Sequence, residues 1–290
     1  MASGVAYEEF AFPKSRRFVM DYVEAGRRKN HIPVLLELDV STALELNRAI
    51  KGITGEGLSF TGWIAKCIAQ AVKEHKAVHA IRRGRKRLVI FQDVDISIPV
   101  EETLEGVEGP TKKFPVPYLM REVDRKSVRE IHTEIRAAQA HPIDPSSSLS
   151  LIQRLVFSFP SPIRRLLIWR RRARDPFHVK KAMGTVALTS VGMFGRGARG
   201  SAWGIPIGAH PLIVLLGAIA RKPAVVEGGI AARDFLSMTV LFDHDVVDGA
   251  PVARFLSRLR ELIEGGYGLH EELEELKGQT GTTAFSASQP

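Results

Sequence analysis

The residues best suited to acid–base chemistry lie together near the C-terminal end of the chain. His244 is followed four residues later by Asp248, and Gly249 comes next. Histidine suits general base work near neutral pH because its unperturbed pKa is about 6.5. An aspartate at this spacing could orient the site or neutralise a neighbouring cation. The spacing alone is common, however, and more often marks a structural pair than a catalytic one.

The segments on either side of His244 indicate how its side chain would be held. The run 235–242 predicts a strand that ends just before the histidine, and a helix is expected to begin at Gly249 or Ala250. The buried face of that helix would be Val252, Phe255, Leu256, Leu259, Leu262 and Ile263. Rigid elements on both sides fix the position of a catalytic side chain.

The rest of the chain alternates helical and extended patterns. We expect helices over 13–28, 41–51, 60–72 and 121–139, and strands over 32–40, within 87–100 and over 212–220. A loop rich in Gly and Pro is expected over 101–117, and a linker over 141–148. Cys67 lies on the apolar stripe of the 60–72 helix, which favours a buried side chain over a reactive thiol.

Composition narrows the class of protein. Hydrophobic residues make up 44% and charged residues 25% of the 290 residues, the balance of a soluble globular protein. A single cysteine excludes a disulfide framework and a multi-cysteine metal site, and fits a cytoplasmic protein. No secretory signal is evident at the N-terminus. The longest apolar stretch, 205–220, is too short and too interrupted to span a bilayer.

The net charge of +9 is concentrated in two places. Residues 146–174 carry seven Arg and no acidic residue, and Arg82 to Arg87 include five basic residues. The run 82–87 most simply forms an exposed hairpin or turn. The segment 149–174 has three interpretations: a helix on an anionic membrane surface, a docking site for an acidic protein, or an insertion packed on the protein itself. Nucleic-acid binding is not expected, because no recognised module is present.

The stretch 242–250 carries a family resemblance. Its sequence, FDHDVVDGA, resembles the segment F-D-H-R-V-x-D-G-A of the catalytic domain of 2-oxoacid dehydrogenase acyltransferases, the dihydrolipoyl transacylase cores. Chloramphenicol acetyltransferase shares the His-x-x-x-Asp-Gly signature more distantly. Residues 184–192, GTVALTSVG, are similar to the family's strand G-T-F-T-x-S-N-x-G. The similarity also covers 215–219, 222–223 and 227–229, and the segments near Pro13, Ile32 and Leu58.

The resemblance implies a fold and a domain organisation. The fold would be α/β, a two-layer sandwich with a mixed β-sheet and helices on one face, the coenzyme A-dependent, chloramphenicol acetyltransferase-like acyltransferase fold. One catalytic domain would span 1–277, with a basic, apolar insertion at about 146–181 in place of a short family connection. A disordered tail is expected over 278–290.

The resemblance also implies a reaction, coenzyme A-dependent acyl transfer to or from a thiol such as a dihydrolipoyl group. His244 would be the general base that removes the thiol proton. The family's oxyanion-stabilising Ser matches Thr189, and Ser190 follows it. Adjacent strand residues face opposite sides, and we favour Thr189 over Ser190. The alternative is that both hydroxyls only satisfy backbone groups.

Two acidic residues follow His244 closely, one that matches the family segment and one that departs from it. Asp248 would be a structural ionic partner, with Arg16 as its mate. Asp245 departs from the family, which usually has Arg after the His. Its carboxylate would either favour the imidazolium form of His244 or point to solvent.

The resemblance implies partners as well. A homotrimer would place His244 beside Thr189 of a neighbouring chain, and trimers could form cubic or dodecahedral shells. Acyl-CoA would be a substrate, and any lipoyl group would come from another chain, such as a lipoyl-carrying protein or 2-oxoacid dehydrogenase components. The run 82–87 could contact coenzyme A phosphates. No metal is expected, since the histidines lack ligand spacing. The alternative function is a non-catalytic scaffold or docking module for a membrane or a partner.

Overall fold

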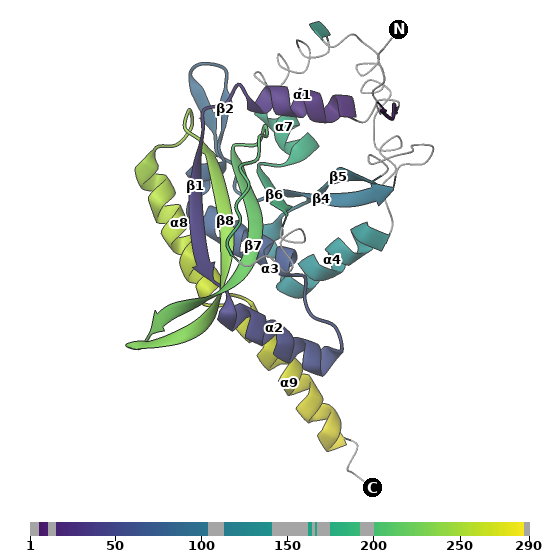
Figure 1. The fold of residues 1–290 in the computed structure, drawn as a ribbon, viewed down its shortest axis with the longest axis vertical. Coiled ribbons are helices and arrows are strands. Elements are labelled where there is room, and N and C mark those ends of the chain that lie inside the picture. The colour runs from purple at the N-terminus through teal and green to yellow at the C-terminus, as the bar shows by residue number, and fades with distance from the viewer. Residues whose placement is uncertain are drawn as a thin grey trace.

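The computed structural model describes residues 6–10, 16–103, 113–140, 162–163, 166, 175–191 and 200–286. Its main sheet has six strands in the order β1-β8-β7-β6-β4-β5 (Figure 1). These are β1 His31–Asp39, β4 Ile96–Thr103, β5 Lys113–Met120, β6 Val186–Ser190, β7 Leu212–Val226 and β8 Gly229–Asp243. The pairs β4–β6 and β6–β7 are parallel and the other neighbours are antiparallel, so the sheet is mixed as expected.

The helices are α1 Arg16–Gly26, α2 Ser41–Thr54, α3 Phe60–Glu74, α4 Val128–Ala140, α7 Pro176–Met183, α8 Gly249–Glu264 and α9 Leu269–Ser286, with short turns η1 Lys76–His79 and η2 Val123–Arg125. Of these, α2, α3, α4, α8 and α9 supply apolar side chains to the core and form the second layer over one face of the sheet. Helix α3 is the central one, and its apolar stripe packs against the sheet and α8. In Figure 1, α1 and α7 lie together at one end, and α9 leads away from the sheet.

Helix α3 shows why the apolar repeat predicted the core correctly. Trp63, Ile64, Cys67 and Ile68 are all buried in it. Ser59 caps the helix, since its side chain accepts the Gly62 N–H. Burial raises the pKa of the Cys67 thiol, which confirms an inert buried cysteine.

Three expectations about the elements are corrected. Of the residues expected to form a loop over 101–117, 104–112 lie outside the described residues. Residues 101–103 belong to β4 and 113–117 belong to β5, and the two strands pair with Glu101 opposite Pro115. Prolines fit there because β5 is the edge strand and needs no ladder donor on its outer side. The expected helix over 121–139 begins only at Val128, after a capping box in which Ser127 and Glu130 exchange hydrogen bonds.

The third correction concerns the C-terminus. The disordered tail was expected from 278, but α9 continues through Ser286, so the expected domain end at 277 falls inside a helix. Residues 287–290 lie outside the described residues. Helix α7 is an element that the sequence pattern missed. Its local signal is Asp175-Pro176: the aspartate accepts the N–H groups of Phe177 and His178, and proline occupies the first turn.

The sheet face opposite α3 is crossed by the segment 200–208. Trp203 Nε1 donates to the Leu36 carbonyl (3.2 Å), and Ala218 N donates to the Ala202 carbonyl (3.1 Å). A Cβ atom on Gly217 would overlap that Ala202 oxygen, so glycine is required where the segment crosses β7. The segment covers only part of the face, because Leu35 of β1 remains exposed.

Candidate active site

His244 lies in a tight turn between β8 and α8, as the sequence predicts. Strand β8 ends at Asp243, whose carbonyl accepts the Val246 N–H (3.0 Å). The His244 backbone N–H donates to the Asn30 carbonyl in the loop before β1 (2.9 Å). The His244 side chain is exposed, and its ring centroid lies 6.0 Å from that of Phe242. The backbone is therefore held while the imidazole stays accessible.

The turn is surrounded by paired charges. Lys29 forms an ion pair with Asp243. Asn30 Nδ2 donates to Asp245 Oδ1 (2.8 Å), and an Arg82 guanidinium nitrogen lies 3.7 Å from Asp245 Oδ2. Asp245 is exposed, as one of the two expectations had it, and its carboxylate oxygens also lie near Asn30 and Arg82. Its effect on His244 stays a prediction.

Asp248 is the residue that precedes α8. Its backbone is extended, its carbonyl accepts the Val252 N–H (3.4 Å), and its side chain is exposed. Arg16 is the first residue of α1. No Asp248–Arg16 ion pair is formed among the described residues, so that pairing stays a prediction.

Thr189 and Ser190 end β6 and point to opposite faces. Thr189 lies in register with Leu215 of β7 and, through it, with Thr239 of β8. Ser190 shares the face of Leu188, which belongs to the core. Within the described part of the chain the Thr189 hydroxyl makes no hydrogen bond, whereas Ser190 does interact. The preference for Thr189 as the oxyanion donor stays a prediction.

A single chain does not bring Thr189 and His244 together. Thr239, level with Thr189, lies four residues before Asp243 on β8 and two strands away from β6. At about 3.4 Å per residue and about 4.8 Å per strand, the separation is on the order of 15 Å or more. That distance excludes both side chains acting on one substrate atom within one copy.

The basic run 82–87 forms the expected hairpin. Strands β2 Ile81–Arg83 and β3 Arg87–Val89 pair antiparallel, and Gly84 adopts φ 63° in the turn. We call 81–89 the basic hairpin. Arg83, Arg85, Lys86 and Arg87 are exposed and form no ion pair with the described residues. Arg82 alone is paired, with Asp245 beside His244.

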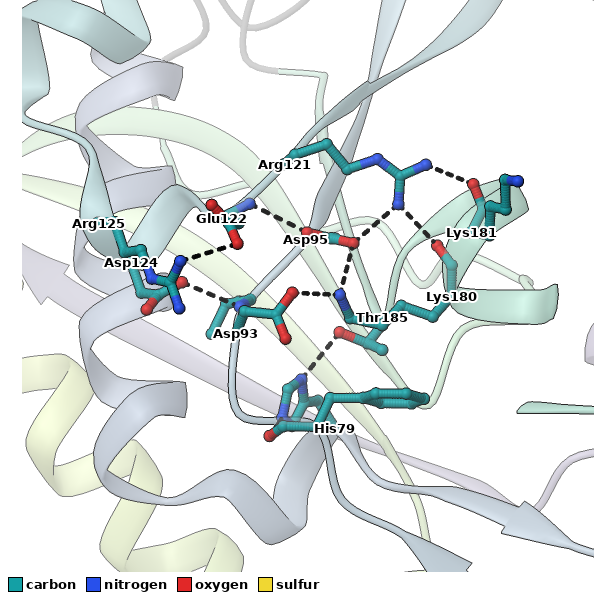
Figure 2. Close-up of polar contacts among 12 residues, drawn as sticks. His79, Asp93, Asp95, Arg121, Glu122, Asp124, Arg125, Lys180, Lys181 and Thr185 are labelled. Carbon is teal, nitrogen blue, oxygen red and sulfur yellow. Dashed lines mark hydrogen bonds and ion pairs between the residues drawn. The ribbon is translucent and has the colours of Figure 1, made fainter. Parts of the chain in front are cut away.

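A buried polar cluster lies at the base of the basic hairpin, and sequence reasoning missed it. We call it the Asp95 network (Figure 2): His79, Asp93, Asp95, Arg121, Lys180 and Thr185. The Asp95 carboxylate, in a residue only 1% exposed, receives Arg121 (2.8 Å), Lys180 (2.9 Å) and the Glu122 N–H (3.0 Å). The sequence does contain an indication of this network, because Asp93 and Asp95 interrupt the apolar run before β4.

His79 connects this network to the basic hairpin. Its Nε2 donates to the Phe91 carbonyl (3.2 Å), so its Nδ1 accepts from the Thr185 hydroxyl (2.8 Å). Burial lowers the pKa of His79 to about 4, which keeps the ring neutral near pH 7. Burial also opposes the charge of Lys180, but hydrogen bonds to Asp93 and Asp95 raise the pKa of Lys180 overall.

Several expectations concern other kinds of site. Among the described residues no group of His, Cys, Asp and Glu is arranged to hold a metal ion. No helix in the described ranges is long and apolar enough to cross a membrane. Most of the basic insertion at 146–181 lies outside the described residues, including nearly all of the segment 149–174. Its membrane, acidic-partner and packing interpretations therefore stay untested.

Comparison with known proteins places this fold in a family. The family described as 2-oxoacid dehydrogenases acyltransferase (catalytic domain) matches residues 7–144 and 171–270, and the gap falls in the expected insertion. The lipoamide acyltransferase component of the branched-chain alpha-keto acid dehydrogenase complex of Bacillus subtilis is 25% identical over 246 residues, 82% of this chain and 48% of that protein. The chain thus spans about half the length of the curated relatives it matches.

Solved structures agree on the fold. The dihydrolipoamide acetyltransferase of Azotobacter vinelandii superposes with a TM-score of 0.66 at 18% identity, over 92% of this chain and 96% of that one. The cubic core of the pyruvate dehydrogenase multienzyme complex gives a TM-score of 0.64 at 17% identity, over 92% and 96%. With more than half of the sequence matched, this chain belongs to the family of 2-oxoacid dehydrogenase acyltransferase catalytic domains.

Proposed function

We propose that this chain catalyses coenzyme A-dependent acyl transfer to or from a thiol, with His244 as the general base. The observation that carries the proposal is the His244 turn. Its backbone is fixed by the Asn30 carbonyl, its imidazole is exposed, and it lies in the segment whose sequence resembles the family's active-site segment. A dihydrolipoyl group is the acceptor or donor that the names of the relatives favour.

The reaction needs two functions from the protein. The His244 imidazole takes the proton of the attacking thiol, which is only slightly ionised at neutral pH, and the thiolate forms a bond to the thioester carbonyl carbon. The tetrahedral oxyanion then collapses, and the leaving thiolate takes the proton back from the imidazolium. A hydroxyl donor for the oxyanion is worth about 10²–10³ in rate. We assign this donor to Thr189.

Thr189 would come from a second copy of the chain. Within one copy it lies too far from His244, so the site would be completed between subunits of a trimer or a larger shell. Exposed apolar side chains at two places support this. Leu35 on the edge strand β1 is 52% exposed, and Val225 and Ile230, which lie opposite each other on β7 and β8, are 80% and 83% exposed. Apolar side chains exposed side by side, as in this pair, favour contact with another protein surface.

The basic hairpin supports coenzyme A as a substrate. Arg83, Arg85, Lys86 and Arg87 carry charge that no described residue neutralises, and Arg82 places the hairpin beside the His244 turn. Phosphate groups match such a surface, and a local cluster of cations attracts them at long range. We therefore propose that the hairpin faces the phosphate end of coenzyme A while the thiol lies at His244.

The test is a transfer assay with the whole chain. Purified protein is incubated with acetyl-CoA and dihydrolipoamide, then with other thiols, and coenzyme A release is followed. We expect turnover that His244→Ala lowers by about 10²–10⁴. The proposal fails if no acyl-CoA is bound or turned over, or if His244→Ala is as active as the unaltered chain. A non-catalytic scaffold would give that negative result.

A further inference from the structure

We propose that Asp245 and Arg82 hold the His244 turn in its working position. Together with Asn30 they form a contact that we call the clamp. The inference rests on the proposed role of His244, and it makes Arg82 and Asp245 positioning residues that act through the histidine.

The clamp contacts two successive residues of the turn, His244 and Asp245. The Asn30 carbonyl accepts the His244 N–H (2.9 Å), and the Asn30 side-chain amide donates to Asp245 Oδ1 (2.8 Å). Arg82 approaches the other oxygen, Oδ2 (3.7 Å). A shift of Asp245 would therefore pull on the Asn30 contact that fixes the His244 backbone.

Arg82 lies on β2 of the basic hairpin, and a hydrogen bond at the base of the hairpin holds this strand in place. His79 is the last residue of η1, just before β2, and Phe91 lies two residues after β3; the His79 Nε2 donates to the Phe91 carbonyl (3.2 Å) and joins the two ends of the basic hairpin. His79 is fully buried and also bonded to Thr185. The base of the basic hairpin is thus anchored in the Asp95 network, three residues from Arg82. An anchored cation positions its partner better than one on a free loop.

The clamp also explains how this chain tolerates an acid after the catalytic histidine. The family usually has Arg at this position, whereas here an acid follows His244 and an arginine from β2 lies beside it. Asp243, the acid on the other side of His244, is paired with Lys29. Each carboxylate next to the histidine therefore has its own cation.

The experiment compares Arg82→Gln and Asp245→Asn with a matched control, Arg136→Gln. Arg136 is 54% exposed and pairs with Glu56 (3.1 Å), much as Arg82 is 56% exposed and pairs with Asp245. Hydrogen exchange of the amides 244–247 reports the turn, and the transfer assay reports kcat and KM. We expect exchange about two- to fivefold faster and kcat about tenfold lower in both clamp variants, with KM nearly unchanged. Arg136→Gln should match the unaltered chain.

Exchanging the charges of residues 82 and 245 gives a more specific test of the clamp. Asp245→Arg alone places two arginines together and should loosen the turn further, whereas Asp245→Arg combined with Arg82→Asp should restore slow exchange and most of kcat. Unchanged exchange in Arg82→Gln and Asp245→Asn, or a double variant no better than Asp245→Arg, would overturn the clamp. An unaltered chain without acyl-CoA turnover would instead refute the proposed function, and the exchange data would still decide the clamp.

Discussion

The Asp95 network and the His244 turn are both built from charged residues, yet they are opposites. Asp95 and His79 are 1% and 0% exposed, and every contact that they need comes from the same chain. His244, Asp245 and Asp248 are exposed, and Thr189 lies too far away to join them. The buried charges fix geometry, whereas the exposed ones stay accessible from outside the chain.

Desolvation is the physical reason for the difference. A buried carboxylate without partners would cost several kcal/mol, so the fold surrounds Asp95 with two cations and a backbone N–H. An exposed histidine carries no such cost, because water solvates it until a substrate arrives. Removing a residue should therefore affect stability in the first region and catalysis in the second.

The largest effect is expected from Asp95→Ala. Its loss leaves Arg121 and Lys180 without their shared buried partner, and should lower the free energy of unfolding by about 3–5 kcal/mol. Urea unfolding measures this. Asp93→Ala is the control, because the Asp93 side chain is 27% exposed and bonds only Lys180 in this network. Equal losses in the two variants would contradict the distinction between buried and exposed charges.

Thr189→Ala should act on catalysis alone. We expect kcat to fall by about 10²–10³ with little change in stability, because an oxyanion donor is lost. Thr189→Ser keeps the hydroxyl and should retain most of kcat. Ser190→Ala, on the opposite face of β6, should have the smaller effect. If Ser190→Ala were the more damaging variant, the donor assignment would move to Ser190.

The buried His79 should make the free energy of unfolding depend on pH. Its folded pKa of about 4 lies below the unfolded value of about 6.5, so the unfolded chain binds the extra proton between these values. Stability should therefore fall as pH decreases through this window, by about 3 kcal/mol in total. His79→Gln keeps a donor for the Phe91 carbonyl and should show a flatter dependence in urea titrations. Parallel curves would exclude His79 as the source.

The basic hairpin should give the smallest effect. Arg85→Gln with Lys86→Gln removes two exposed cations and should raise KM for acetyl-CoA by about three- to tenfold at low salt, and less at high salt. A thioester of N-acetylcysteamine lacks phosphates and serves as the control substrate. If KM for that substrate rose equally, the hairpin would not be recognising phosphate.

Much of the fold could be predicted from local patterns in the sequence. The apolar repeat of α3, the strand before His244 and the helix after it were all predicted, because each depends on neighbours close in the sequence. The pairing of β4 with β5 was not, since Pro115 and Pro117 look like loop residues until the strand is placed at a sheet edge.

The candidate site, too, could be predicted from the sequence only in part. His244, Asp248 and Thr189 were predicted from short motifs and their family resemblance. The partners of Asp245 were not, because Asn30 and Arg82 come from distant segments and meet only in the folded chain. The distance between Thr189 and His244 likewise follows from strand order, which no local pattern reveals.

The central claim is that the active site forms between two copies of the chain, and mixing two inactive variants tests it most directly. His244→Ala and Thr189→Ala are unfolded and refolded separately and together, and acetyl transfer to dihydrolipoamide is measured. We predict that the mixed sample regains a substantial fraction of activity, because some interfaces combine an intact His244 with an intact Thr189. A mixed assembly as inactive as either variant alone would contradict the account.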